Sequence, residues 1–358
     1  MSHCKLQKTE LILGNSNPKF SGVTSTMLQV LEHQKKLIPL SVLGSHHLPK
    51  DIYSINFLKA LRLCWHPLTN GTARVFHARR NNEMLQALAL KKLSPNPLKI
   101  AFTSTAQREH TWITKWLMRQ ADAVISTCTA AASYIQDGAD VIIPHGVDLD
   151  RFQPSADRSA LWGKLGFPGK YGIGIFGRVR HQKGVDVLIE AILPLLKDFP
   201  DFTVIICGET TAKHKNFERA LKAKIATAGM QKRFIFLGKQ PFSSLPELFQ
   251  SMHLVAALSR NEGFGLTVLE AMASGSSVIA SKAGAWQDIV RPGITGEIVP
   301  CGDIVATRNK LTSLLSDTKI LEEMGRNGRK IAGEKYSLEN EAHSLIHYFR
   351  KLQIGDSL

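Results

Sequence analysis

Two carboxylates and a glycine turn lie close together between residues 261 and 276. Glu262 precedes a turn containing Gly263 and Gly265, and Glu270 lies in the apolar run that follows, which has the composition of a helix. Glycines let backbone N–H groups approach a ligand closely, and a helix N-terminus attracts anions. We therefore expect a nucleotide-sugar site in which one carboxylate reaches sugar hydroxyls and the other a ribose.

A second candidate element lies about eighty residues earlier. The apolar strand predicted at Tyr171–Phe176 is followed by Gly177 and then by Arg178 and Lys183, which flank the start of an amphipathic run at 185–196. A pyrophosphate leaving group needs fixed positive charge aimed at its developing negative charge. The two cations are therefore candidates for holding a diphosphate.

These segments resemble the retaining glycosyltransferases of family 4, which have the two-domain GT-B fold. The matching segments, in order, are Val141–Asp148 with Phe152, Gly177-Arg178, Lys183-Gly184, Phe236–Gly238, Glu262 to Glu270, and Gly293–Gly296. Three N-terminal segments more narrowly resemble the lipopolysaccharide core biosynthesis mannosyltransferases of Gram-negative bacteria: Phe20–Thr26, Phe76–Asn81 and Phe102–Arg108.

The resemblance implies roles for individual residues. Arg178 and Lys183 would hold the donor diphosphate, Glu262 would bind hydroxyls of the transferred hexose, and Glu270 would bind the ribose. The other donor contacts would come from Gly177, Gly238, Lys239, Gly263, Phe264, Gly265 and Leu266. The family needs no metal ion and no cofactor beyond its nucleotide-sugar substrate.

The chain departs from the family pattern in its N-terminal half. The loop that lies near donor phosphate and acceptor usually has two adjacent glycines, whereas here it reads Ser21-Gly22. Many members have a histidine that touches the hexose, and the corresponding region leaves Gln107, Arg108 and His110 as alternatives. His145 stands where the family usually has asparagine.

Apolar strands, such as those expected at Tyr171–Phe176 and Phe202–Cys207, alternate with helical stretches along the chain. This alternation predicts parallel sheets with helices on both faces. At 358 residues, the chain is long enough for two domains. We expect an acceptor-binding Rossmann-like domain at 1–150, a nucleotide-sugar-binding Rossmann-like domain at 151–335, and a helix at 336–358 that packs back on the first domain. Ligands of such doubly wound folds bind at strand C-terminal ends, so the cleft between the domains is the expected site.

Charge is unevenly placed along the sequence. Residues 1–121 hold 17 lysines and arginines against 5 aspartates and glutamates, whereas the rest of the chain holds 28 against 25. This distribution favours an anionic partner for the first domain. Two stretches, 55–65 and 108–119, combine tryptophan with lysine and arginine, which suits the headgroup boundary of a membrane if the tryptophans are not buried in the core.

Other features bound the location and the chemistry. No apolar run approaches the length of a membrane span and no leader is evident, so we expect a cytoplasmic protein at the inner face of the inner membrane. The five cysteines have no zinc or disulfide spacing, and Cys128 and Cys207 are expected in the core. Asp148 and Asp150 are expected in a turn, and Glu262 with Glu270 is not expected to be a hydrolase pair.

The predicted reaction is transfer of a hexose to an anionic lipid-linked acceptor. The resemblance implies mannose from GDP-mannose and the inner core of lipopolysaccharide. A transferase that uses a UDP-hexose donor and a nucleotide-sugar epimerase remain as alternatives, because no side chain is expected to distinguish the base or the hexose epimer. Nucleic-acid binding is not expected, since the basic half has no recognition motif. A nicotinamide site is not expected either. Gly172, Gly174 and Gly177 have the spacing of the dinucleotide-binding motif, but the first two lie within the predicted strand and not after it.

Overall fold

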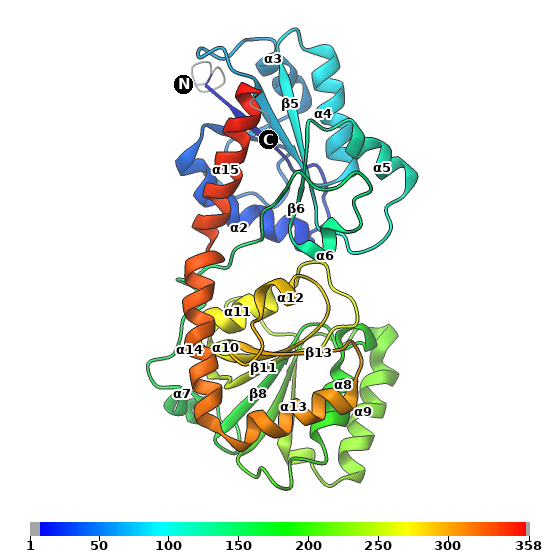
Figure 1. Cartoon of the computed structure of the whole chain (residues 1–358), viewed down its shortest axis with the longest axis vertical. Coiled ribbons are helices and arrows are strands. Elements are labelled where there is room, and N and C mark those ends of the chain that lie inside the picture. The colour runs from blue at the N-terminus through cyan, green and yellow to red at the C-terminus, as the bar shows by residue number, and fades with distance from the viewer. Residues whose placement is uncertain (1–7, 356–358) are drawn as a thin grey trace. The chain divides into compact units, whose positions relative to one another are not determined.

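The computed structural model describes residues 8–355, which form two compact units (Figure 1). The first unit contains the described chain up to Gly146 together with the segment from Leu338 onward, and the second runs from Val147 to Ser337. Each unit is built on one fully parallel sheet, of seven strands in the first and six in the second. The predicted α/β fold with two Rossmann-like halves is therefore confirmed.

The sheet of the first unit has the strand order β3-β2-β1-β4-β5-β6-β7. Its strands are β1 (Leu11–Gly14), β2 (Leu40–Leu43), β3 (Ser54–Ile55), β4 (Arg74–Ala78), β5 (Leu98–Ser104), β6 (Ala123–Ser126) and β7 (Val141–Ile142). β1, β4 and β6 are buried along their whole length, as expected of parallel strands covered on both faces. β2 and β3 were not predicted from the sequence.

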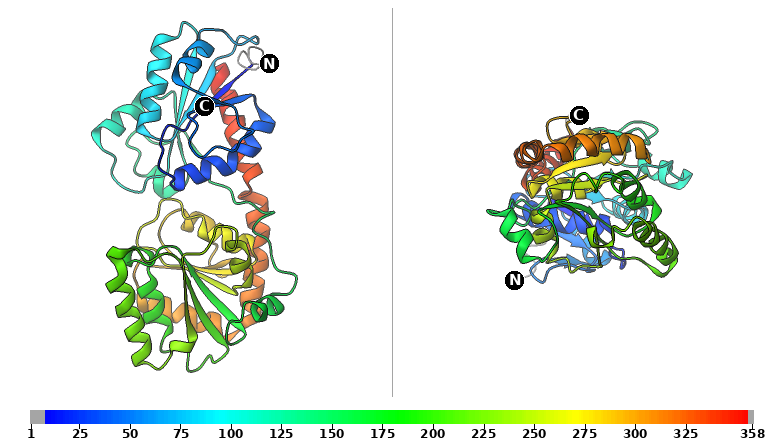
Figure 2. Two further views of the ribbon diagram at one scale, coloured as in Figure 1. Left: turned by 180° about the vertical axis from the view of Figure 1, so that it is seen from behind. Right: turned by 90° about the horizontal axis from the view of Figure 1, so that it is seen from below.

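Helices cover both faces of this sheet. α2 (Gly22–Leu37) and α15 (Leu338–Ile354) lie side by side on one face, where Met27, Val30 and Leu31 pack with Leu345 and Phe349 (Figures 1 and 2). The other face is covered by α3 (Phe57–Cys64), α4 (Asn81–Leu93) and α5 (Trp112–Arg119), and α6 (Thr129–Ala132) follows β6. The last helix of the chain thus shares the core of the first unit.

The sheet of the second unit has the order β10-β9-β8-β11-β12-β13. Its strands are β8 (Tyr171–Phe176), β9 (Phe202–Cys207), β10 (Phe234–Gly238), β11 (Leu254–Ala257), β12 (Ser277–Ser281) and β13 (Gly296–Val299). β8 and β9 have the predicted bounds, whereas β13 was not predicted. Inside β8, an added Cβ on Gly172 would lie 2.3 Å from the Trp162 ring, and one on Gly174 would lie 2.6 Å from the Phe176 ring. These two glycines therefore allow close packing and do not form a dinucleotide loop.

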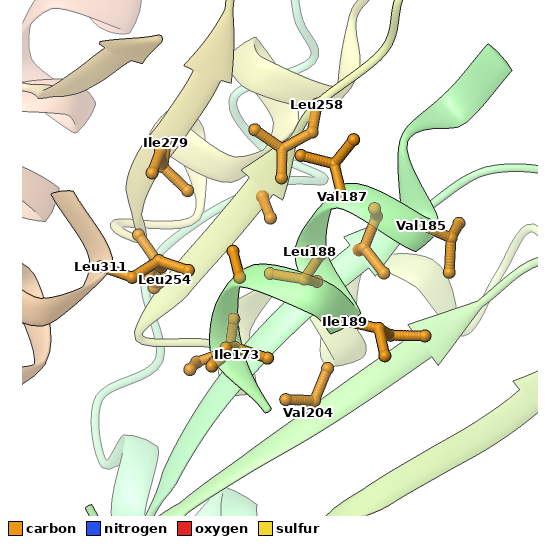
Figure 3. Packing of buried hydrophobic residues seen from close by; sticks show 14 of the residues in the cluster. Ile173, Val185, Val187, Leu188, Ile189, Val204, Leu254, Leu258, Ile279 and Leu311 are labelled. Carbon is orange, nitrogen blue, oxygen red and sulfur yellow. The ribbon is translucent and has the colours of Figure 1, made fainter. Parts of the chain in front are cut away.

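Apolar side chains from α8 (Val185–Ile192), α9 (Lys215–Thr227) and α13 (Ile304–Ser316) form the core on one face of this sheet. Figure 3 shows the part of this core where α8 and Leu311 of α13 meet the strands. Val187 and Leu188 of α8 lie fully or almost fully buried over Ile173 and Val204 of the strands. The remaining helices are α7 (Arg158–Lys164), α10 (Leu245–Ser251), α11 (Thr267–Ala273), α12 (Trp286–Ile289) and α14 (Thr318–Lys335). α11 packs against α10, β11, β12 and α14.

The division into units changes the charge comparison made from the sequence. When residues 122–146 and the C-terminal segment are counted with the first unit, it holds 19 lysines and arginines against 11 aspartates and glutamates. The second unit holds 26 against 19. The two units therefore differ little in net charge. The expectation that positive charge is concentrated in the first unit as a whole is wrong.

Two further expectations concern the whole chain. Within residues 8–355, no helix combines the length and the apolar content needed to span a bilayer. Cys64, Cys128 and Cys207 are buried free thiols and Cys301 is an exposed one, whereas Cys4 lies outside the described residues.

Candidate active site

The strand order of the second unit reverses between β8 and β11, so the loops that follow these strands lead to opposite sides of the sheet. In open α/β sheets, ligands bind where the connections diverge in this way. Backbone bonds tie the neighbouring strand ends together: Gly177 N–H donates to Cys207 O at 2.9 Å, and Gly208 N–H donates to Gly238 O at 2.9 Å. Gly177 and Gly238 of the predicted site thus belong to one hydrogen-bonded edge.

Lys183 and Glu262 form an ion pair at this point of the sheet. Lys183 ends a short 3-10 turn, His181–Lys183, and Glu262 follows β11; both side chains are 19% exposed. The Ser259 hydroxyl also donates to the carboxylate of Glu262 at 3.2 Å. The sequence predicted that these two charged groups bind different parts of one ligand, and the structure places them in direct contact.

Gly184 explains how the two loops come so close. It adopts a φ of +70°, and a Cβ at this position would lie 2.0 Å from the carbonyl oxygen of Leu258. Next to this contact, Arg260 binds Asp186 of α8 through two bonds of 3.0 and 2.8 Å. The loop after β11 is therefore fixed to the start of α8. Sequence reasoning missed Arg260 and Asp186, which have no characteristic spacing.

The turn after Glu262 is hydrogen-bonded to the start of α12. The Trp286 indole N–H donates to Gly265 O at 2.8 Å, and Ala285 N–H donates to Phe264 O at 3.0 Å. Gly265 has a φ of +85°. The predicted turn from Gly263 to Leu266 therefore exists, with Phe264 buried as its anchor, and α11 begins at Thr267 directly after it. Trp286 was not predicted as part of the site.

Glu270 lies half-buried on α11. Burial raises the pKa of Glu270 to about 7, although the positive charge of Arg151 acts in the opposite direction. The Arg151 guanidinium lies 3.8 Å above the ring of the exposed Phe242. Arg151 and Phe242 are thus further candidates near Glu270, and no pattern in the sequence links them.

The remaining predicted donor residues are open to solvent. Arg178, Gly238 and Lys239 are exposed at the ends of β8 and β10. A cation, a carboxylate and exposed positive groups along one sheet edge can hold an anionic leaving group next to a hydroxyl-bearing ligand. Asp148, in contrast, accepts bonds from the backbone N–H groups of Asp150 and Arg151 at 3.1 and 2.9 Å, so this segment is a turn, as predicted.

In the first unit the strand order reverses between β1 and β4. Ser21 is the N-cap residue of α2, and its hydroxyl accepts a bond of 3.0 Å from Arg80, which follows β4. Arg80 also donates to Thr24 at 2.8 Å and pairs with the fully buried Glu83. Space is open around Gly22, where an added Cβ would meet nothing within 4 Å. Arg80 was not assigned a role from the sequence.

The three alternatives near β5 lie in different surroundings. His110 lies 3.3 Å from the Ser104 hydroxyl, and burial, with Arg108 as a second cause, lowers its pKa. Gln107 donates to the Cys128 sulfur at 3.6 Å, and Arg108 is exposed. His145, in the asparagine position, is buried and pairs with Glu341 of α15 at 2.9 Å. It therefore ties the last helix to the sheet.

The three tryptophans of the first unit are exposed; two lie on α5 and one directly follows α3. Trp112 and Trp116 are 78% and 48% exposed, and Leu58 and Trp65 are 74% and 59% exposed. Leu117 and Met118 provide the buried side of α5. The alternative that these tryptophans are core residues covering the sheet is therefore wrong.

Comparison with known proteins gives the family. The pattern named Glycosyl transferases group 1 matches residues 160–331. The chain is 38% identical over 353 residues to the lipopolysaccharide core biosynthesis mannosyltransferase LpcC of Rhizobium leguminosarum bv. viciae. The aligned region covers 98% of this chain and 99% of the relative. LpsB of Rhizobium meliloti (strain 1021), which has the same description, is 38% identical over 97% of this chain and 99% of its own.

Solved structures agree with this result. The C-terminal domain of the group 1 family protein LpcC from Francisella tularensis is 39% identical, with a TM-score of 0.52 over 54% of this chain and 99% of that chain. Anabaena Alr3699/HepE, solved in complex with UDP, is 18% identical and shares the fold, with a TM-score of 0.79 over 96% of this chain and 100% of its own. The chain therefore belongs to the group 1 glycosyltransferases and has their GT-B fold.

Proposed function

We propose that this glycosyltransferase moves mannose from GDP-mannose, with retention of configuration, to an anionic lipid-linked saccharide of the lipopolysaccharide inner core. Two relatives described as core mannosyltransferases, each 38% identical over almost the whole chain, support this choice of donor and acceptor. The observation that carries the mechanism is the Lys183–Glu262 pair at the β8/β11 reversal. The second unit binds the donor and the first unit binds the acceptor.

In this mechanism the donor separates the ion pair. The diphosphate binds Lys183 and Arg178. The hexose hydroxyls bind Glu262 and the backbone of the turn from Gly263 to Leu266. Gly177, Gly238 and Lys239 line the nucleotide, and Glu270 accepts bonds from the ribose. Each group released from the pair gains a partner of opposite charge or a hydroxyl donor, so neither is left buried and unpaired.

Departure of the nucleotide dominates the reaction, because positive charge aimed at the developing phosphate charge stabilises an oxocarbenium-like transition state. Loss of one such interaction typically costs about 3–4 kcal/mol of barrier, or ~10²–10³ in rate. The departing phosphate oxygen takes the acceptor proton. Ser21 and Gly22 lie beside the acceptor, and one of Gln107, Arg108 and His110 contacts the hexose.

The exposed tryptophans of α5, and the side of α3 that carries Leu58, Arg62 and Trp65, bind the cytoplasmic leaflet of the inner membrane. Trp112 and Trp116 stand outward on α5 beside Lys115 and Arg119, and tryptophan with adjacent cations suits the headgroup boundary. Sedimentation with anionic and neutral vesicles tests this contact. Equal binding of the native chain and a Trp112→Ala, Trp116→Ala variant to anionic vesicles would contradict it.

Transfer itself is tested with radiolabelled donors and a core acceptor that lacks mannose. We expect lipid-extractable label from GDP-mannose and none from UDP-glucose, with the α-anomeric linkage of the donor kept in the product as observed by NMR. Label from UDP-glucose alone would assign the UDP-hexose alternative. Interconversion of sugar nucleotides without an acceptor would assign the epimerase alternative.

A further inference from the structure

A cavity of about 430 Å³ lies in the first unit at the ends of β1, β2 and β3. Its lining is mostly polar and includes Ser16, Ser45, Ser54, Asn56, Lys59 and Gln86. It begins beside the β1/β4 reversal, since Ser16 follows β1 and Gln86 lies on α4. We call this cavity the unit 1 pocket. Its volume lies in the range of about 300–1,000 Å³ that is typical of small-ligand sites.

The walls of the unit 1 pocket are fixed by hydrogen bonds. Ser16 Oγ donates to Gln86 Oε1 at 2.5 Å, which leaves the amide N–H groups of Gln86 as donors. Asn15 Nδ2 donates to His46 O at 2.7 Å, and Gly44 N–H donates to Ile55 O at 3.0 Å. A Cβ at Gly44 would lie 2.2 Å from Asn15 O, so this close approach of the loops depends on glycine. These bonds and this close packing hold the walls of the pocket in place.

The electrostatic character of the pocket is positive. Its lining contains Lys59 and no aspartate or glutamate. The Lys59 side chain is exposed, and no carboxylate of residues 8–355 pairs with it within 4.0 Å. Hydroxyl and amide groups around one unneutralised ammonium group match a ligand that has several hydroxyls and a negative charge.

α3 presents a second feature beside the pocket. Leu58, Arg62 and Trp65 are spaced at i, i+4 and i+7, which places them on one side of the helix. Leu58 and Trp65 are exposed, so this side combines apolar surface with a cation. A ligand whose charged sugar enters the pocket beside Lys59 would therefore bring an attached lipid headgroup close to surface that suits it.

We propose that the unit 1 pocket binds an acidic sugar residue of the acceptor, and that Lys59 recognises its anionic group. This inference rests on the proposed function, because it assigns the charge of the lipid-linked acceptor to one sugar and one side chain. Lys59 acts here as a specificity residue and takes no part in departure of the nucleotide. The anionic group is a carboxylate of the sugar or a phosphate attached to it.

The test compares Lys59→Gln with Lys92→Gln, which removes an exposed lysine of α4 outside the pocket. Acceptor binding is measured by calorimetry, and donor hydrolysis in water is measured without acceptor. A hydrogen bond to a charged group is worth roughly a factor of 10–100 in affinity. We expect Lys59→Gln to weaken acceptor binding by about this factor, with donor hydrolysis unchanged and Lys92→Gln like the native chain.

Modified acceptors identify the anionic group. The native chain is expected to lose affinity for either a carboxyl-reduced or a dephosphorylated acceptor, whereas Lys59→Gln loses nothing more on the same change. If the variant still discriminates against both as strongly as the native chain, Lys59 does not read the charge and the proposal is wrong. Because calorimetry needs no turnover, absence of mannosyl transfer would refute the proposed function and leave this comparison intact.

A second variant tests the cavity itself. Ser45→Phe places a large side chain in the unit 1 pocket from an exposed loop position, so the core of the unit is not altered. We expect acceptor affinity to fall while the melting temperature and donor hydrolysis stay close to native values. Native acceptor affinity in this variant would show that the acceptor does not enter the pocket.

Discussion

We predict that Glu270 makes the affinity for the donor dependent on pH. Burial raises the pKa of its carboxyl from 4.5 to about 7, so in the free enzyme only about one molecule in eleven has an ionised Glu270 at pH 6, and about ten in eleven at pH 8. If the ribose hydroxyls donate to the carboxylate, the donor binds the ionised form preferentially. We therefore expect donor affinity to rise about tenfold between pH 6 and pH 8, as measured by calorimetry with an intact sugar nucleotide.

The control is Glu270→Gln, which keeps the shape and removes the titration. Its affinity should be nearly constant over the same range and should lie below that of the native chain at pH 8. The intact sugar nucleotide is preferable to the free diphosphate, because a terminal phosphate titrates in the same range. The assignment of this carboxyl to the ribose would be refuted if the donor affinity of the native chain did not change with pH, or if Glu270→Gln showed the same change.

Three other changes have defined outcomes. Lys183→Ala should lower turnover by ~10²–10³ while the fold survives, and near-normal turnover would remove Lys183 from leaving-group stabilisation. Gly184→Ala should destabilise the second unit by about 2 kcal/mol more than Gly229→Ala in chemical denaturation. Both glycines have φ near +70°, but only at Gly184 would the added Cβ lie 2.0 Å from a carbonyl oxygen, whereas at Gly229 it would meet nothing within 4 Å. Glu341→Ala removes the acceptor that binds His145 and the Gly146 N–H, and should cost about 1–3 kcal/mol with faster hydrogen exchange in α15. Glu339→Ala, at an exposed position of the same helix, should cost less than about 1 kcal/mol.

The sequence predicted best those elements whose pattern is local. β8 and β9 are continuous apolar runs, and their bounds follow directly from composition. α14 was missed because Gly325 and Gly328 lower its intrinsic helix preference. The structure explains these glycines: a Cβ on Gly325 would lie 2.1 Å from Gly275 O, and Gly328 lies close to Met272 of α11. The residues that disfavour the helix locally are those that let it pack.

The family resemblance assigned the candidate site residues one by one, but it did not predict their arrangement. Lys183 and Glu262 are 79 residues apart and meet because β11 pairs with β8 after the chain has already formed β9 and β10 on the other side. Nothing in either local pattern encodes that pairing. The same applies to Trp286, which fixes Gly265 from a separate element, and to Arg151, whose charge acts on Glu270 from a turn that precedes the whole sheet.

The departure at Ser21 has a structural reason that the family pattern alone does not show. Ser21 has a φ of −149°, an extended conformation that any residue can adopt, so the backbone at this position does not require a second glycine. Its hydroxyl instead accepts a bond from Arg80, which also binds Thr24 and Glu83. Arg80 thereby holds the start of α2 beside the end of β4, where the strand order reverses. A guanidinium committed to three partners can position this loop, whereas Lys59 has no carboxylate partner within residues 8–355 and is free to meet an incoming anion.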